Sequence, residues 1–290
     1  MKLVDALVTG LAQGAMIALV ALGYTMVYGV LKLINFAHSE IFMMGAYVGL
    51  FAIMALGGEA NPILATAAGT VIAMLACSAL GVAVERVAYR PLRGRGKSPL
   101  VRVTPLVTAL GMSVLLQNLA QLLFSPRYRS YPHPFEKTRI AIVVTAVVVM
   151  VVLEVIVKTT WFGKAMRALS THEEAARLMG VRTGRVIAMT FALGSSLAAL
   201  GAVLFCLDQS QAYPTMGMVI GTRAFVAAVL GGIGSITGAM LGGLLLGVLG
   251  ELVKLTDYSG GVDVLVFVVL IAVLLVRPAG LLGSARVEKV

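Results

Sequence analysis

Long stretches without a single charged residue dominate the pattern of hydrophobic and polar positions along the chain. A helix needs about 20 apolar residues to cross the hydrocarbon core of a bilayer, and most of these stretches approach or exceed that length. A soluble protein of this size could not keep so many apolar segments away from water in one core. The pattern therefore predicts an all-α, polytopic helical membrane protein. The eight uncharged stretches of 13 or more residues are 6–31, 41–58, 60–84, 103–126, 140–153, 186–207, 224–250 and 264–276.

The longest stretch, 224–250, does not have the pattern of one plain span. It contains eight glycines, and the segment 231–238 (GGIGSITG) in its middle disfavours a continuous helix. We expect two helical pieces, 223–233 and 236–254, that meet at a broken or re-entrant segment. A second break is expected near 32–40, which is too apolar for a free loop and too polar for lipid. The chain would then have eight to nine hydrophobic segments.

Composition and charge exclude several other classes of protein. Only 36 of the 290 residues are charged, or 12%, which is about half of the roughly 25% typical of soluble domains. The net charge of +10 comes from basic residues between the hydrophobic stretches, where such residues set the orientation of spans. A soluble enzyme, a nucleic-acid binder and a secreted disulfide scaffold are therefore excluded.

The basic residues also predict the orientation of the spans. Segments 85–102 and 158–185 contain six Lys or Arg residues each and are expected in the cytoplasm, whereas 57–62 and 208–222 contain none and are expected outside. The C-terminus is basic and is expected in the cytoplasm, with the N-terminus outside. This arrangement requires an odd number of crossings after 208–222, which supports the break within 224–250.

Motifs for catalysis or metal binding fail on inspection. Segment 94–98 (GRGKS) resembles the end of a phosphate-binding loop, but Pro91 stands where that loop needs glycine. Segment 172–174 (HEE) lacks the second histidine of a zinc-binding H-E-x-x-H motif. Cys77 and Cys206 each lie inside an apolar stretch and are interpreted as packing residues. We expect a non-catalytic chain with no metal and no cofactor.

The two expected breaks supply the candidate functional residues. Paired broken helices indicate a transporter whose pathway lies near the middle of the membrane. At the first break, Asn35, His38 and Glu40 are candidates for a polar pathway wall, because ionisable groups at membrane depth are costly. Asn35 and Glu40 could alternatively cap the exposed helix ends. The candidates at the second break are Gly231, Gly232, Gly234, Ser235 and Thr237.

The connector 158–185 contains a short predicted helix. Ser170-x-x-Glu173 and Thr171-x-x-Glu174 both have the spacing of a capping box, so a helix is expected to begin there. Gly180 is suited to its C-terminal cap. The helix would present a small apolar surface, either as a solvated amphipathic segment or as a docking site for a cytoplasmic subunit. The residues of that surface are Ala175, Ala176, Leu178 and Met179.

Several motifs resemble those of a known family. Glu174-Ala175-Ala176-x-x-x-Gly180 is similar to the E-A-A-x-x-x-G coupling helix of bacterial ABC import permeases. Segments 23–29 (GYTMVYG), 34–40 (INFAHSE) and 44–47 (MGAY) resemble the N-terminal signature of the branched-chain amino acid permease family (LivH type). Ser39 departs from that signature, which has glycine after the histidine. Further motifs follow in the family's order at 108–111, 230–235 and 277–281.

The resemblance implies a function and a set of partners. Residues 1–290 would form a single transmembrane permease domain of an ABC importer in the bacterial inner membrane, with leucine, isoleucine and valine as cargo. The transporter would be completed by a second permease subunit, expected to be a different chain, by two cytoplasmic ATP-binding subunits and by a periplasmic amino acid-binding protein. Nucleic acid would have no part in it. The residues implied in coupling to the ATPase are Glu174, Ala175, Ala176, Leu178, Met179 and Gly180.

Two alternatives remain open from the sequence. Urea and short-chain amide permeases of the same importer class share these signatures, so the cargo could be of that kind. An ion-coupled secondary transporter also uses broken helices, but it usually requires acidic residues within the membrane. Glu154, at the edge of the stretch 140–153, is a weak candidate for that role.

Overall fold

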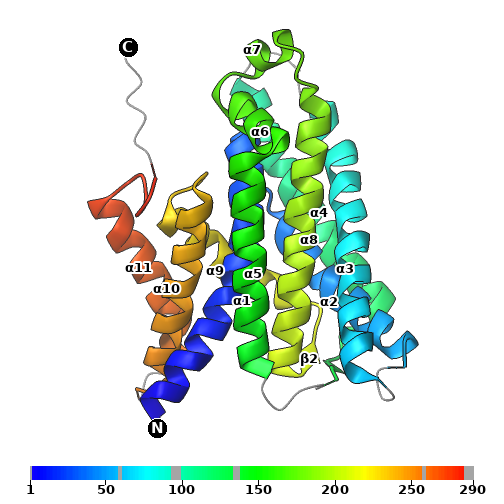
Figure 1. The fold of residues 1–290 in the computed structure, drawn as a ribbon, viewed down its shortest axis with the longest axis vertical. Coiled ribbons are helices and arrows are strands. Elements are labelled where there is room, and N and C mark those ends of the chain that lie inside the picture. The colour runs from blue at the N-terminus through cyan, green and yellow to red at the C-terminus, as the bar shows by residue number, and fades with distance from the viewer. Residues whose placement is uncertain (1, 58–60, 93–98, 133–137, 257–258, 284–290) are drawn as a thin grey trace.

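A computed structural model describes residues 2–57, 61–92, 99–132, 138–256 and 259–283. Helices make up nearly all of this described part (Figure 1). The GRGKS segment at 94–98 lies outside the described residues. The helices are α1 (Lys2–Leu31), α2 (Ala37–Ala55), α3 (Pro62–Val84), α4 (Pro99–Phe124), α5 (Thr138–Thr159), α6 (Trp161–Thr171), α7 (Glu173–Leu178), α8 (Thr183–Gln209), α9 (Met216–Gly231), α10 (Ile236–Lys254) and α11 (Val262–Val276), with the π-helix η1 (Glu85–Tyr89) and the 3-10 helices η2 (Arg90–Leu92) and η3 (Ser259–Gly261).

The lengths of the helices confirm an all-α polytopic membrane protein. Within the described residues, seven helices are long and apolar enough to cross a membrane. Two further apolar helices, α9 and α11, are shorter. Together they agree with the expected eight to nine hydrophobic segments.

Two short strands, β1 (Arg129–Ser130) and β2 (Gln211–Ala212), pair antiparallel and were not anticipated from the sequence. They lie at the end of the molecule where α1 begins, whereas α6 and α7 cover the opposite end (Figure 1). Tyr131 follows β1, and its backbone N–H donates to the carbonyl of Ser210. Burial raises the pKa of the Tyr131 hydroxyl above its usual range, so this side chain stays neutral.

Small residues bring the central helices together. Gly10 and Gly14 of α1 face Gly247 of α10, and a Cβ atom added at Gly14 would lie 2.8 Å from the Cα atom of Leu244. On the other side of α10, Gly242 packs against the backbone of α9. Without a hydrophobic driving force between helices in lipid, such backbone contact is a main source of stability. The spacing Gly-x-x-x-Gly therefore acts as expected, as a helix-packing device.

Both expected breaks are present. The first separates α1 from α2 at 32–36, and Lys32 there has a left-handed backbone with φ of 56°. The second separates α9 from α10 at 232–235. The piece expected at 223–233 begins earlier, at Met216. Arg223 does not end the helix because its guanidinium lies 2.7 Å from the carboxylate of Asp263, which compensates its charge.

Candidate functional site

Asn35 closes the first break. Its Oδ1 atom accepts hydrogen bonds from the backbone N–H of Ala37, at 3.1 Å, and from the hydroxyl of Tyr89, at 2.9 Å. The first bond satisfies an N–H at the start of α2, as the capping alternative predicted, and the second ties the break to η1. The Nδ2 atom is buried and has no hydrogen-bond partner among the described residues.

His38 fills a groove on α1. Its Nε2 atom donates to the carbonyl of Val20 at 3.2 Å, and its ring stands edge-on to Tyr24 with centroids 4.7 Å apart. Gly23 makes room for the ring, because a Cβ atom at that position would overlap the imidazole. The ring is buried and packed on all these sides, so His38 holds α2 against α1.

Glu40 is a carboxylate buried among three helices, with 2% of the residue exposed. Its Oε1 atom lies 3.3 Å from the hydroxyl of Ser113 on α4 and 3.3 Å from that of Ser39. Ser39 also donates to the carbonyl of Phe36 at 2.7 Å, so Ser113 is the donor best placed for Glu40. The Oε2 atom faces Gly217 of α9 and has no partner among the described residues. A buried, half-satisfied carboxylate in a membrane span is costly and is a functional candidate.

Ser39 fits its position because the facing residues of α9 are glycines, which leave room for its side chain. A Cβ atom at Gly221 would overlap the Cβ atom of Ser39, and Gly217 faces the carbonyl of the same residue. The departure from the family signature therefore has a local structural explanation.

The residues of the second break divide between two environments. Gly231 and Gly232 are buried against backbone, Gly231 against α10 and Gly232 against Ala279 and Gly283. Thr237 is exposed and donates to the carboxylate of Glu154 at 3.1 Å. These three residues hold the break in place and do not line the cavity described below.

The segment 277–283, which follows α11, hydrogen-bonds to the second break. The backbone N–H groups of Leu281 and Leu282 donate to the carbonyls of Leu230, at 2.8 Å, and Gly231, at 3.0 Å. These are terminal carbonyls of α9 that have no partner within the helix. The family motif at 277–281 had no expected role. In the structure its last residue, Leu281, donates to a terminal carbonyl of α9.

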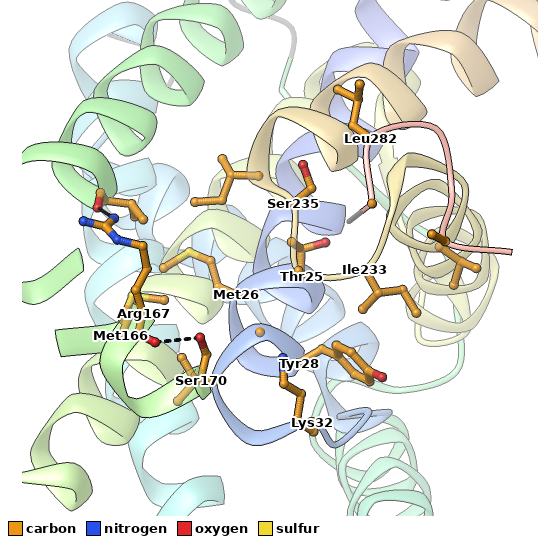
Figure 2. Close-up of a pocket in the computed structure, with 18 of the residues that line it drawn as sticks. Thr25, Met26, Tyr28, Lys32, Met166, Arg167, Ser170, Ile233, Ser235 and Leu282 are labelled. Carbon is orange, nitrogen blue, oxygen red and sulfur yellow. Dashed lines mark hydrogen bonds between the residues drawn. The ribbon is translucent and has the colours of Figure 1, made fainter. Parts of the chain in front are cut away.

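A cavity of about 730 Å³ lies between the end of α1 and the second break (Figure 2). Gly234 and Ser235 contribute to its wall, together with residues of α5, α6, α9 and α11 and of the segment 278–283. The hydroxyl of Ser235 accepts from the N–H of Gly238 at 3.1 Å, so Ser235 also caps α10. Asn35, His38 and Glu40 are not among the lining residues. The wall from the end of α1 and the first residue of the break consists of Thr25, Met26, Tyr28, Gly29, Val30 and Lys32.

The connector folds as two helices, α6 and α7, instead of one. Ser170 and Thr171 end α6, and their hydroxyls donate to the carbonyl of Arg167, both at 2.9 Å. The expected capping box is therefore wrong. α7 begins at Glu173, after His172, which makes no side-chain cap.

Gly180 ends α7 as predicted. It has φ of 82°, its N–H donates to the carbonyl of Arg177, and the N–H of Val181 donates to that of Ala176. This pair of bonds is a Schellman motif. Ala176 is buried against the chain itself, whereas Leu178 and Met179 are 89% and 84% exposed, and Glu174 and Ala175 are also exposed.

Comparison with known proteins identifies the family. The family described as branched-chain amino acid transport system / permease component matches residues 6–275. The chain belongs to this permease family. The matched region includes both breaks and α7.

Individual relatives agree over almost the whole length. The permease is 41% identical over 306 residues to the high-affinity branched-chain amino acid transport system permease protein BraD of Pseudomonas aeruginosa, covering 98% of the chain and 97% of that protein. It is 40% identical over 303 residues to LivH of Escherichia coli, with 97% and 96% covered. The ribose import permease protein RbsC of Bacillus subtilis is 34% identical over 142 residues, 46% of the chain and 44% of that protein. No solved structure matches the permease.

The permease is thus a multi-pass membrane transport protein of a family that is not catalytic. Its predicted site residues fall into three places: the buried cluster at the first break, the second break and α7. Sequence reasoning missed Tyr24, Thr25, Lys32 and Ser113. Tyr24, Thr25 and Lys32 lie in or beside segment 23–29, and its resemblance to the family signature could have pointed to them. Ser113 belongs to no motif found in the sequence.

Proposed function

We propose that the permease is the membrane subunit of an ABC importer that carries leucine, isoleucine and valine across the inner membrane. The observation that carries this proposal is the 40–41% identity over nearly the full chain to proteins named as high-affinity branched-chain amino acid permeases. The cavity supports it, because its partly polar wall also presents aliphatic side chains, such as those of Val157, Ile233 and Leu274, that a branched aliphatic group can contact.

The partners follow from the same proposal. α7 would dock on one of two cytoplasmic ATP-binding subunits through the exposed side chains of Leu178 and Met179. These two apolar side chains are adjacent and nearly fully exposed, and contiguous exposed apolar surface indicates a contact site. A second, different permease chain and a periplasmic amino acid-binding protein would complete the transporter. No step of the function requires a metal or cofactor on this chain.

The orientation is proposed from charge. The end that carries α6 and α7 is rich in basic residues and would be cytoplasmic, and the end that carries β1 and β2 would be outside. With α9 and α10 as separate crossings, the N-terminus lies outside and the C-terminus inside.

The test is ATP hydrolysis by the reconstituted transporter with its binding protein. Leucine, isoleucine and valine should stimulate hydrolysis, whereas urea, acetamide and ribose should not. Stimulation by urea or acetamide alone would replace the cargo with the amide class. Uptake that needs no ATP and disappears with a protonophore would contradict the importer and favour an ion-coupled carrier.

A further inference from the structure

α4 is the least buried of the seven candidate membrane spans. In its most apolar stretch 17% of the residues are buried in the protein, against 28% in α3 and in α5 and 83% in α8. α4 packs mainly against α2 and against the short helices η1 and η2. Most of its circumference must therefore contact either lipid or another protein.

The exposed faces of α3 and α5 are suited to lipid. Every exposed residue of α3 between Pro62 and Val84 is apolar. The exposed residues of α5 between 140 and 153 are aliphatic, with Thr145 as the one polar exception. The hydrocarbon of a bilayer offers no hydrogen-bonding groups, so such apolar faces are what it requires.

The surface of α4 is different in character. Its span is less hydropathic than those of α3 and α5, although it is the least covered by the rest of the chain. Polar groups that face lipid are costly, whereas the same groups between two helices stabilise their association. The polar residues of this span are Thr104, Thr108, Ser113, Gln117, Asn118 and Gln121.

Two glutamines lie on one edge of α4, one helical turn apart. Gln117 and Gln121 are half-buried, and their amides have no hydrogen-bond partner among the described residues. Gln117 lies seven residues before Phe124, the last residue of α4, and so about 10 Å from the end of the helix at 1.5 Å per residue. An amide at this depth requires a hydrogen-bonding group from a neighbouring helix.

A second group of residues lets a neighbouring helix approach closely. Gly111 is exposed, and a Cβ atom added there would meet nothing within 4 Å. Asn118, two turns further along the same face, is also exposed, and its Nδ2 atom donates to the carbonyl of Val114 at 2.8 Å. Small residues beside hydrogen-bonding residues are typical of contacts between membrane helices.

We propose that this exposed face of α4 binds a transmembrane helix of the second permease subunit. The amides of Gln117 and Gln121 exchange hydrogen bonds with polar groups of that helix, and Gly111 lets the two backbones come close. The polar positions lie within the span, so their partner must lie within the membrane too. Of the partners proposed above, the second permease subunit meets that requirement, and the inference rests on the proposed function for this reason.

Photo-crosslinking in the complete transporter tests which molecule covers α4. Leu115 lies on this face between Gly111 and Asn118 and is 56% exposed, and Val148 of α5 is the matched control at 54%. With p-benzoylphenylalanine in place of Leu115, illumination should join the permease to the second permease subunit. The same residue in place of Val148 should give no such product. A product made only of two copies of the permease, or no protein product at all, would overturn the proposal.

The contribution of the amides is measured by the stability of the permease pair in detergent. Replacing both glutamines by leucine, Gln117→Leu with Gln121→Leu, should weaken retention of the second permease subunit about tenfold, since interhelical hydrogen bonds are lost. Thr145→Val, which removes the exposed hydroxyl of α5, is the control and should leave retention unchanged. Unchanged retention in the double variant would contradict the proposal, because a face in contact with lipid tolerates leucine. The amount of each variant in the membrane shows that insertion is normal.

Uptake measurements separate this inference from the proposed function. A transporter that imports leucine with ATP, but gives no crosslink from position 115 to the second permease subunit, contradicts only the assignment of the α4 face. A complex that gives this crosslink but imports no branched-chain amino acid contradicts only the proposed cargo.

Discussion

At the scale of single residues, the polar groups of the first break have different tasks. Asn35 and His38 make hydrogen bonds that fix α2 against α1 and η1, which is structural work. Glu40 differs in being ionisable: its Oε1 atom accepts from Ser113, whereas its Oε2 atom, like the Nδ2 atom of Asn35, has no partner among the described residues. Such incomplete satisfaction in a membrane span has a high energetic cost and argues for a role in the transport pathway.

Removing the charge of Glu40 tests that role. Glu40→Gln keeps the size of the side chain and an oxygen that accepts from Ser113. We expect the rate of leucine uptake to fall about tenfold while the amount of assembled complex stays the same. Asp5→Asn is the control, since Asp5 is exposed near the start of α1, away from the first break. Uptake by Glu40→Gln at the wild-type rate would remove Glu40 from the pathway.

The contact between Ser39 and Gly221 gives a second prediction. Gly221→Ala places a Cβ atom in overlap with that of Ser39, and overpacking of this kind costs about 1–3 kcal/mol. Ser39→Gly removes the overlapping atom, so the double variant should recover most of the lost thermal stability. Gly111→Ala, where a Cβ atom meets nothing within 4 Å, should be neutral. Additive losses in the double variant would contradict the contact.

At the scale of elements, the structure agrees with the sequence where periodicity and glycine content decide the outcome. The break at 232–235 follows from a glycine cluster that no continuous helix favours. The start of α9 could not be found that way, because the partner that neutralises Arg223 is Asp263, far along the chain. The capping box at Ser170 failed for a similar reason. Local spacing allowed a start there, but α6 continues through Ser170 as far as Thr171.

The cap of α7 leads to an element-scale prediction. Gly180→Pro fixes φ near −65° where the chain has 82°, and it removes the N–H that donates to Arg177. We expect ATP hydrolysis to continue without matching leucine uptake, because α7 loses its shape while the permease still inserts. Gly184→Ala, in the first turn of α8, is the control. Normal coupling in Gly180→Pro would exclude α7 as the docking helix.

A second element-scale prediction concerns the clasp, which is the segment 277–283 that hydrogen-bonds to the end of α9. Gly280 has φ of 81° and approaches the backbone of Gly232 so closely that no side chain fits. Gly280→Ala should therefore release the segment from α9 and destabilise the permease by about 1–3 kcal/mol, seen as a lower unfolding temperature. Gly260→Ala meets no neighbour and should leave that temperature unchanged. Equal stability of the two variants would disprove the clasp.

At the scale of the whole molecule, charge distribution predicts which end faces the cytoplasm, and this can be measured with single cysteines. Cys77 and Cys206 are buried and should not react with an impermeant maleimide. Tyr128→Cys, beside β1, should be labelled in intact cells, whereas Leu178→Cys on α7 should require permeabilised membranes. Labelling of Leu178→Cys in intact cells would reverse the proposed orientation.

The clasp also bears on how the permease is made. Leu230 and Gly231 enter the growing chain roughly fifty residues before Leu281 and Leu282, the residues whose N–H groups they bind. At about 5–20 residues per second, the ribosome leaves these carbonyls waiting for several seconds. During that interval the junction of α9 and α10 has its glycine packing and its own local hydrogen bonds, but not the two bonds from Leu281 and Leu282. The second break therefore completes its hydrogen bonding only after the last described residues have been synthesised.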